Sequence, residues 1–159
     1  MVKKFICKFT VVLLDRQIEV YMAVGFKVKF YWYQIGHGDF LHSFFSTVAY
    51  HLENKNWGDR FPIIMNHLYQ GKIDGKDISR AIEELNIIKK ELTAFTPEQV
   101  IWDIEDLLKQ PPWGREISED ITDLSNYFIT SDGKDFIDVF SDALIKAKEM
   151  NSDLEIRSI

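Results

Sequence analysis

The stretch VGFKVKFYWYQIGHGDFLHSFFSTVAYHL, residues 24–52, decides the fold class because its hydrophobic period changes once along its length. Over residues 24–35 the side chains alternate between two faces, one with Phe26, Val28, Phe30 and Trp32 and the other with Lys27, Lys29, Tyr31 and Tyr33. This alternation predicts one half-buried β-strand. Asp39 is then a good helix N-cap, and the apolar residues after it recur at helical spacing. We therefore predict a strand followed by a helix over residues 39–53.

The rest of the chain continues this mixture of helical and strand patterns. Proline and aspartate mark helix starts, glycine marks helix ends, and short β-branched runs mark strands. A capping-box pattern at Thr96–Gln99 favours a helix, but the alternating run after it favours a strand. We expect a single α+β domain, with a small mixed sheet packed by about four helices. The predicted elements are, in chain order, a short helix over 62–70, a turn over 72–76, a helix over 78–94 capped by Asp77, strands over 100–105 and 126–130, a helix beginning at Asp135 and an edge strand over 154–159.

Composition limits the class of protein. The chain of 159 residues is about the size of one domain, and its content of 46% hydrophobic and 28% charged residues is typical of soluble globular proteins. The net charge of −6 argues against non-specific nucleic-acid binding, which requires surplus Lys and Arg. The single cysteine, Cys7, excludes a disulfide within the sequence and a zinc site built on several cysteines. We expect a reduced, cytoplasmic compartment and no cofactor.

Residues 1–21 are expected to be an N-terminal extension of a domain that spans residues 22–159. A basic start and an apolar run give the extension the outline of a signal peptide, but Lys8 interrupts the run and no small-residue cleavage site follows. The run is also too short to span a bilayer, so no membrane partner is expected. We hypothesise that translation starts at Met22, directly before the first clear structural pattern; an intact mass that includes residues 1–21 would reject this.

A second informative stretch is VIWDIEDLLKQPPWG, residues 100–114, which combines two tryptophans, several carboxylates and a proline pair. Trp102 and Ile104 alternate with Asp103 and Glu105, so an extended chain would have one apolar and one acidic face. The prolines stiffen the bend that follows, because proline fixes φ and restricts the residue before it. We expect Trp102 and Ile104 to pack in the core and the acidic edge to form a contact surface.

Acidic residues concentrate in and after this stretch. Residues 98–135 contain 10 acidic and 3 basic residues, a net charge of −7, whereas residues 1–97 have a net charge of +3. Any single carboxylate could simply be solvated or cap a helix. A cluster of carboxylates repels itself, and this cost indicates a compensating gain such as binding. Trp113, beside Gly114 and the prolines, is a candidate aromatic anchor or an ordinary loop-packing residue. The candidate contact residues are Asp103, Glu105, Asp106, Trp113, Glu116, Glu119, Asp120 and Asp123.

Catalytic interpretations find less support. Asp103, Glu105 and Asp106 could ligate a divalent cation in a small metal-dependent hydrolase, which is the main alternative. Such sites normally bring further carboxylates or histidines at a defined spacing, and the four histidines form no HExxH or comparable pattern. No G-x-S-x-G nucleophile motif occurs. We predict no enzymatic activity, no catalytic residue and no metal ligand, and keep a regulatory binding module as the third option.

Three stretches resemble a bacterial family, the immunity protein 70 family of polymorphic toxin systems. They are FYWYQIGHGDFLHSFFSTVAYHLE at residues 30–53, WDIEDLLKQPPWG at 102–114 and ITDLSNYFITSDGKD at 121–135. The resemblance runs from about Val24 to Ala147, in the same order and with similar spacing, and leaves residues 1–21 outside. It carries over no catalytic residues.

The resemblance implies a bacterial, cytoplasmic antidote that binds the C-terminal domain of a cognate toxin and neutralises it. The acidic segment suits a basic, nuclease-type toxin, because carboxylates can mimic the phosphates that a nuclease binds and can speed association. We therefore expect steric and electrostatic occlusion, with a protein and not a nucleic acid as the partner. The sequence leaves the oligomeric state open.

Overall fold

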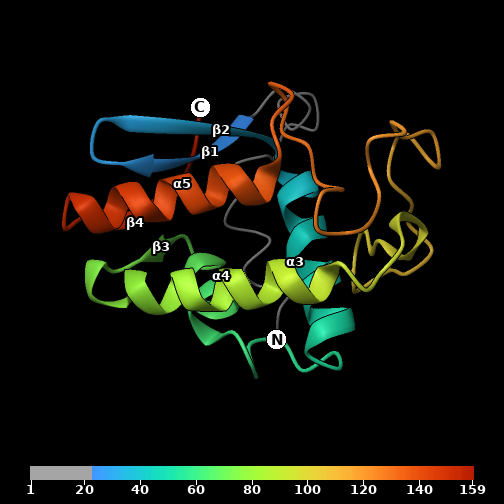
Figure 1. Ribbon diagram of the computed structural model, residues 1–159, viewed down its shortest axis with the longest axis horizontal. Helices are drawn as coiled ribbons and strands as arrows, with labels where there is room; N and C mark the ends of the chain where they lie inside the picture. The colour runs from blue at the N-terminus through green and yellow to red at the C-terminus, as the bar shows by residue number, and fades with distance from the viewer. Residues whose placement is uncertain (1–22) are drawn as a thin grey trace, which may run out of the picture.

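The computed structural model describes residues 23–159, which form a four-stranded sheet packed by helices (Figure 1). The strand order is β2-β1-β4-β3, and every pairing between these strands is antiparallel. Helix α5 (Phe136–Glu149) lies along the sheet, α4 (Ile78–Leu92) packs against α5, and α3 (Gly38–Leu52) runs across the end of this pair. The predicted α+β class is confirmed, although the sheet is antiparallel and not mixed. The expectations for residues 1–21 and Met22 lie outside the described residues.

The first strand region is a hairpin. The prediction of one strand over residues 24–35 is wrong, because the chain forms β1 (Ala23–Val28) and β2 (Tyr31–His37). Lys29 and Phe30 make the two-residue turn, in which Lys29 has a left-handed φ of 51° and Phe30 is exposed. Neither residue is typical of such a turn, which normally contains Asn, Asp or Gly. The reversal therefore has no local signal in the sequence.

The turn also changes which side chains face the core. A two-residue turn preserves the alternation of side chains but inverts its phase, because the residues on either side of the turn pair directly. Tyr33 pairs with Phe26 and packs against the core, whereas Trp32 pairs with Lys27 on the opposite face. The Trp32 ring lies on the backbone of Gly25, where a Cβ would stand only 2.4 Å from Trp32 Cζ2. Trp32 therefore covers the outer face of the sheet and is not the core residue that the alternation predicted.

The three long helices are confirmed, each within two residues of its predicted bounds. Helix α5 begins after Asp135, whose carboxylate accepts hydrogen bonds from the N–H groups of Ile137 and Asp138. The N-cap of α3 is His37 and not Asp39, because His37 Nδ1 accepts a hydrogen bond from the Asp39 N–H at 3.3 Å. Within residues 23–159, none of the helices combines the length and apolar character that a membrane crossing requires.

Near the far edge of the sheet the short elements differ from the prediction in detail. The helix predicted over 62–70 is the π-helix η1 (Ile63–Leu68). The predicted turn over 72–76 contains β3 (Lys72–Ile73), and the 3₁₀-helix η2 (Gly75–Asp77) follows it. The predicted edge strand is β4 (Leu154–Ser158), which lies between β1 and β3. A central place suits β4 because its apolar side chains are buried in the core.

Two predicted strands do not form. The 3₁₀-helix η3 (Pro97–Gln99) carries the capping box, and residues 100–105 continue from it as turns. Residues 126–130 contribute only an isolated bridge between Ile129 and Asp135. The alternating run at 100–105 and the apolar run at 126–130 led to the wrong prediction, because no neighbouring strand is in place to complete a ladder.

Phenylalanines join the sheet to the helices in one core. Phe26 of β1 and Phe140 of α5 have ring centroids 4.8 Å apart. Phe44 of α3 meets Phe136 of α5 nearly edge-to-face at 4.9 Å. Such contacts between tilted rings are favourable beyond the area that they bury. These phenylalanine contacts therefore hold α3 and α5 on the sheet. Helix α3 in turn supports the candidate site.

Candidate functional site

Residues 100–124, here called the acidic loop, run as successive turns at one end of the molecule (Figure 1, yellow to orange). Side chains of α3 hold the first part of the loop. Thr47 Oγ1 accepts a hydrogen bond from the Ile101 N–H at 3.1 Å, and Ser46 Oγ accepts one from the Ile104 N–H at 3.1 Å. Helix hydroxyls therefore take the place of a neighbouring strand, which explains why an extended ladder does not form here.

Asp103 is the structural centre of the acidic loop. Its side chain is only 16% exposed, and it accepts hydrogen bonds from the Glu105 N–H at 2.9 Å and from Lys109 Nζ at 3.2 Å. Its Oδ1 also lies 3.3 Å from His42 Nε2. Burial raises the pKa of the Asp103 carboxyl, but the hydrogen bonds and the nearby imidazole outweigh burial, so the pKa is lowered from its ordinary value of 3.8. The negative charge of Asp103 is therefore paired with groups of the protein itself and is not presented to solvent.

His42 connects Asp103 to the interior of the fold. Its Nδ1 lies 3.2 Å from the Tyr69 hydroxyl, and its Nε2 lies 3.3 Å from Ser46 Oγ. The imidazole also stacks on Trp57 at a centroid distance of 6.4 Å. A catalytic triad requires the serine and the carboxylate on opposite ring nitrogens, whereas Ser46 and Asp103 both lie at Nε2. This arrangement suits the positioning of a loop and not the activation of a nucleophile.

Trp113 is held in the loop and still reaches solvent. Its Nε1 donates a hydrogen bond to the Tyr127 hydroxyl at 2.9 Å, and its ring meets Trp102 edge-on at 5.4 Å. Trp113 remains 39% exposed, while the neighbouring Pro111 is buried. The packing and anchor interpretations are therefore compatible for Trp113. Trp102 and Ile104 are partly buried against the core, which confirms their predicted packing role.

A second internally bonded carboxylate closes the far end of the acidic loop. Asp123 accepts hydrogen bonds from the N–H and hydroxyl of Ser125 and from the Thr122 hydroxyl. Burial raises the pKa of Asp123, but these hydrogen bonds outweigh it and lower the pKa. The Leu124 N–H then donates to the Phe95 carbonyl at 3.1 Å, which ties the loop to the segment after α4.

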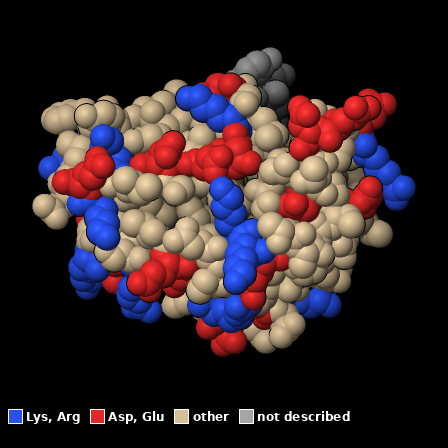
Figure 2. Space-filling model, in the orientation of Figure 1, with Lys and Arg blue, Asp and Glu red and all other residues tan. Residues whose placement is uncertain are grey.

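The remaining candidate carboxylates face solvent. Figure 2 shows acidic side chains over the outer part of the acidic loop, at the upper right of the view, and a second acidic area along α5. The eight candidates therefore divide into two residues that hold the loop, Asp103 and Asp123, and six that the loop presents. The presented residues are Trp113, Glu105, Asp106, Glu116, Glu119 and Asp120.

Comparison with known protein families gives a match over most of the chain. The model of the family described as immunity protein 70 matches residues 26–156. The chain belongs to the immunity protein 70 family. A search of curated proteins and a search of solved structures found no match. The matched region contains β2, the three long helices and the whole acidic loop, so the candidate site lies within the part that defines the family.

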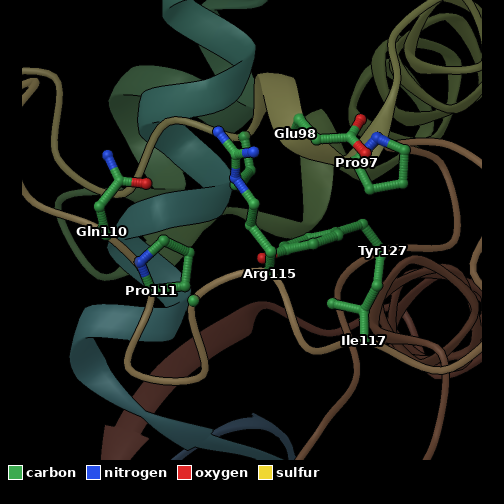
Figure 3. Close-up of a pocket in the computed structure, with 9 residues that line it drawn as sticks. Pro97, Glu98, Gln110, Pro111, Arg115, Ile117 and Tyr127 are labelled. Atoms are coloured by element: carbon green, nitrogen blue, oxygen red, sulfur yellow. The ribbon is translucent and has the colours of Figure 1, made fainter.

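A pocket beside the acidic loop is smaller than a typical small-molecule site. Its volume is about 60 Å³, and Arg115 extends across it between Gln110 and Glu98 (Figure 3). Pockets that enclose small-molecule ligands usually measure roughly 300–1,000 Å³. The pocket is therefore a surface recess between η3 and the loop. Its lining residues are Pro97, Glu98, Val100, Gln110, Pro111, Gly114, Arg115, Ile117 and Tyr127.

The three carboxylates of the alternative hydrolase do not form a metal-binding group. Within the described residues, no three His, Cys, Asp or Glu side chains are placed to hold one metal ion together. Asp103 is directed at His42 and Lys109, whereas Glu105 and Asp106 are exposed. The geometry therefore separates the residues that a cation would have to bring together.

Sequence reasoning missed two features of this site. His42 was not connected to Asp103, because the two residues are 61 positions apart and only the tertiary fold brings them into contact. Leu107 and Leu108 were given no role by the sequence, yet they are 51% and 91% exposed. Their adjacency was the available signal, since a single amphipathic strand cannot bury two consecutive residues on one face.

Proposed function

We propose that this family member neutralises a bacterial toxin by binding its toxin domain and covering the surface that the toxin needs for its activity, without catalysis of its own. Membership of the immunity protein 70 family over residues 26–156 is the observation that carries the proposal. Occlusion is stoichiometric, so one folded antidote protects against one toxin domain. The partner is the C-terminal domain of a cognate polymorphic toxin.

The acidic loop is the proposed contact surface. Five of its carboxylates face solvent, and hydrogen bonds to α3 and within the loop fix the backbone that carries them. A charged surface held in one conformation loses little conformational entropy on binding and attracts an oppositely charged partner over long range. An acidic surface favours a basic partner. A nuclease-type toxin domain, which must bind nucleic acid, is such a partner. Such a toxin acts on nucleic acid in the cytoplasm, where the antidote must then be present.

Co-expression tests the proposal directly. The toxin domain encoded by the open reading frame adjacent to this gene is expressed in a bacterial host with and without the full chain. We expect growth arrest with the toxin alone, rescue by the antidote, and a stable complex of the two purified proteins. Absence of either rescue or binding would overturn the proposed function.

A charge-reversal pair tests the role of the acidic loop. Glu105→Lys combined with Glu116→Lys reverses two exposed carboxylates, and Glu83→Lys combined with Asp142→Lys makes the same charge change at exposed positions of α4 and α5. We expect the loop variant to associate with the toxin domain roughly tenfold more slowly at low salt and to lose much of the salt dependence, because electrostatic steering acts on the association rate. Equal rates for the two variants would count against the acidic loop as the steering surface.

A further inference from the structure

We propose that Leu107 and Leu108 form the apolar anchor of the toxin interface, inserted into an apolar pocket of the toxin domain that basic side chains surround. This inference rests on the proposed function and names the part of the acidic loop that supplies the binding energy. The exposed carboxylates then act mainly on association, and the leucine pair acts on dissociation.

Exposure first distinguishes the pair. Leu108 is 91% exposed and Leu107 is 51% exposed, at consecutive positions of one turn. Single exposed apolar residues are ordinary on protein surfaces, but two adjacent leucines, one half-exposed and one almost fully exposed, place a contiguous apolar area in water and favour association. Energetic centres of interfaces are apolar or aromatic side chains that become fully desolvated and are ringed by polar contacts.

Hydrogen bonds next show that the turn is built to keep the leucines outside. The Asp106 N–H donates to the Asp103 carbonyl, and the Lys109 N–H donates to the Asp106 carbonyl, both at 3.1 Å. Asp106 Oδ1 accepts a hydrogen bond from the Leu108 N–H at 3.2 Å. The backbone is therefore closed into two consecutive turns, so little conformational freedom remains to be lost when a partner binds.

Asp103 acts as the positioning residue of this turn. Its carboxylate bonds to residues on both sides of the leucines, the Glu105 N–H before them and Lys109 Nζ after them. His42 of α3 holds the same carboxylate from the side of the core. The leucines are consequently fixed relative to α3, and Asp103 acts through the loop and not by contact with the toxin.

Charge around the turn specifies the partner. Glu105 and Asp106 are exposed directly before the leucines, while the positive charge of Lys109 is paired with Asp103. The anchor therefore presents an apolar tip with a net negative border. A complementary surface has an apolar pocket and Lys or Arg at its rim, which agrees with the basic toxin domain proposed above.

The experiment measures binding of the toxin domain encoded beside this gene to the wild type, to Leu108→Ala and to the Leu107→Ala/Leu108→Ala double variant. Ile145→Ala on α5, at a side chain that is also exposed, is the matched control. We expect Kd to rise about 30-fold or more for the double variant, mainly through faster dissociation, and to stay within about threefold for the control. Thermal unfolding of each variant verifies that the fold is retained.

The outcomes separate this inference from the proposed function. If the wild type does not bind the toxin domain, the proposed function fails. If the wild type binds and the double variant binds within about threefold of it, the anchor is wrong and the proposed function stands. If the double variant instead converts a wild-type dimer into monomers and keeps full toxin binding, the leucines serve self-association, which also overturns the anchor.

Discussion

Two irregular loops of this protein are held by a carboxylate in the same way and to opposite effect. In the loop over residues 54–61, Glu53 is 2% exposed and accepts hydrogen bonds from the N–H groups of Gly58, Arg60 and Phe61. That loop turns its apolar Phe61 into the core. In the acidic loop, Asp103 fixes the backbone by hydrogen bonds, and the turn that follows it exposes Leu107 and Leu108 to solvent.

The difference shows what each carboxylate does. Glu53 accepts hydrogen bonds from backbone N–H groups inside the fold, and these hydrogen bonds stabilise the folded state. Asp103 orders the turn that carries the exposed leucines. Its hydrogen bonds therefore fix the conformation of a surface more than they stabilise the core. A loop that is fixed and still exposes leucines is better explained by binding than by stability. The following predictions test this division, from the largest expected effect to the smallest.

Removal of the Glu53 carboxylate should give the largest loss of stability. Glu53→Ala removes a buried carboxylate and leaves three backbone N–H groups without their acceptor, that of Phe61 buried and those of Gly58 and Arg60 partly buried. We expect the free energy of unfolding to fall by about 3–5 kcal/mol, as when one partner of a buried charged network is removed. Urea denaturation measures the loss, and Glu53→Gln, which keeps one carbonyl oxygen, should lose less. A loss below about 1 kcal/mol for Glu53→Ala would contradict the role assigned to this residue.

Glycine substitutions should separate the two loops next. Gly58 has a φ of 83°, and a Cβ there would stand 2.3 Å from the Asn66 side chain. Gly114 has a φ of 59°, and beyond its two chain neighbours no described residue comes within 4 Å of its Cβ position. We expect Gly58→Ala to cost about 2–3 kcal/mol, from both strain and overlap, and Gly114→Ala to cost about 1 kcal/mol, from strain alone. Thermal unfolding measures both, and equal losses would show that the acidic loop is packed as tightly as the inner one.

These loops also show how far the sequence could lead. The amphipathic helices α3, α4 and α5 were predicted because each buries one face, and a buried face leaves a period of about 3.6 in the sequence. Residues 100–105 were wrongly predicted as a strand because their hydrogen-bond partners are hydroxyls on α3, more than 50 residues away. Local patterns contain no information on such partners.

The site was predictable in outline only. The concentration of carboxylates pointed to residues 100–123 and the resemblance pointed to a family; the family is confirmed, and the contact residues stay a prediction. Composition cannot distinguish a carboxylate that faces solvent, such as Glu105, from one that holds the loop, such as Asp103. That distinction depends on the position of His42, which follows from the packing of α3.

The Asp103→Asn variant should have a small effect on stability and a larger one on the order of the turn. The substituted amide would keep the shape and one acceptor oxygen but lose the charge that pairs with Lys109 and faces His42. We expect a loss of about 1 kcal/mol in unfolding free energy, together with faster amide exchange at Leu108. Hydrogen exchange of the wild type and the variant measures the second effect. Unchanged exchange at Leu108 would show that the turn is ordered without the Asp103 carboxylate.

The pH dependence of stability should separate Asp103 from a carboxylate that serves only the core. Burial raises the pKa of Glu84 above its ordinary 4.5, although the N–H groups of Ile63 and Ile64 donate hydrogen bonds to it. The folded protein therefore binds that proton more tightly than the unfolded chain, and the contribution of Glu84 to stability rises as the pH falls through the raised pKa. The pKa of Asp103 is lowered, so its contribution is present above its ordinary 3.8 and is lost as the pH falls through the lowered value.

The two matched amide variants should consequently respond in opposite directions. Between about pH 7 and pH 3, we expect the stability deficit of Asp103→Asn relative to wild type to shrink, and that of Glu84→Gln to grow, each by about 1 kcal/mol. Urea titrations at several pH values measure both differences on the same wild-type reference. The contrast arises because hydrogen bonds and the imidazole favour the ionised form of Asp103, whereas burial disfavours the ionised form of Glu84. Parallel pH profiles would show that the acidic loop is held by burial and not by its charge.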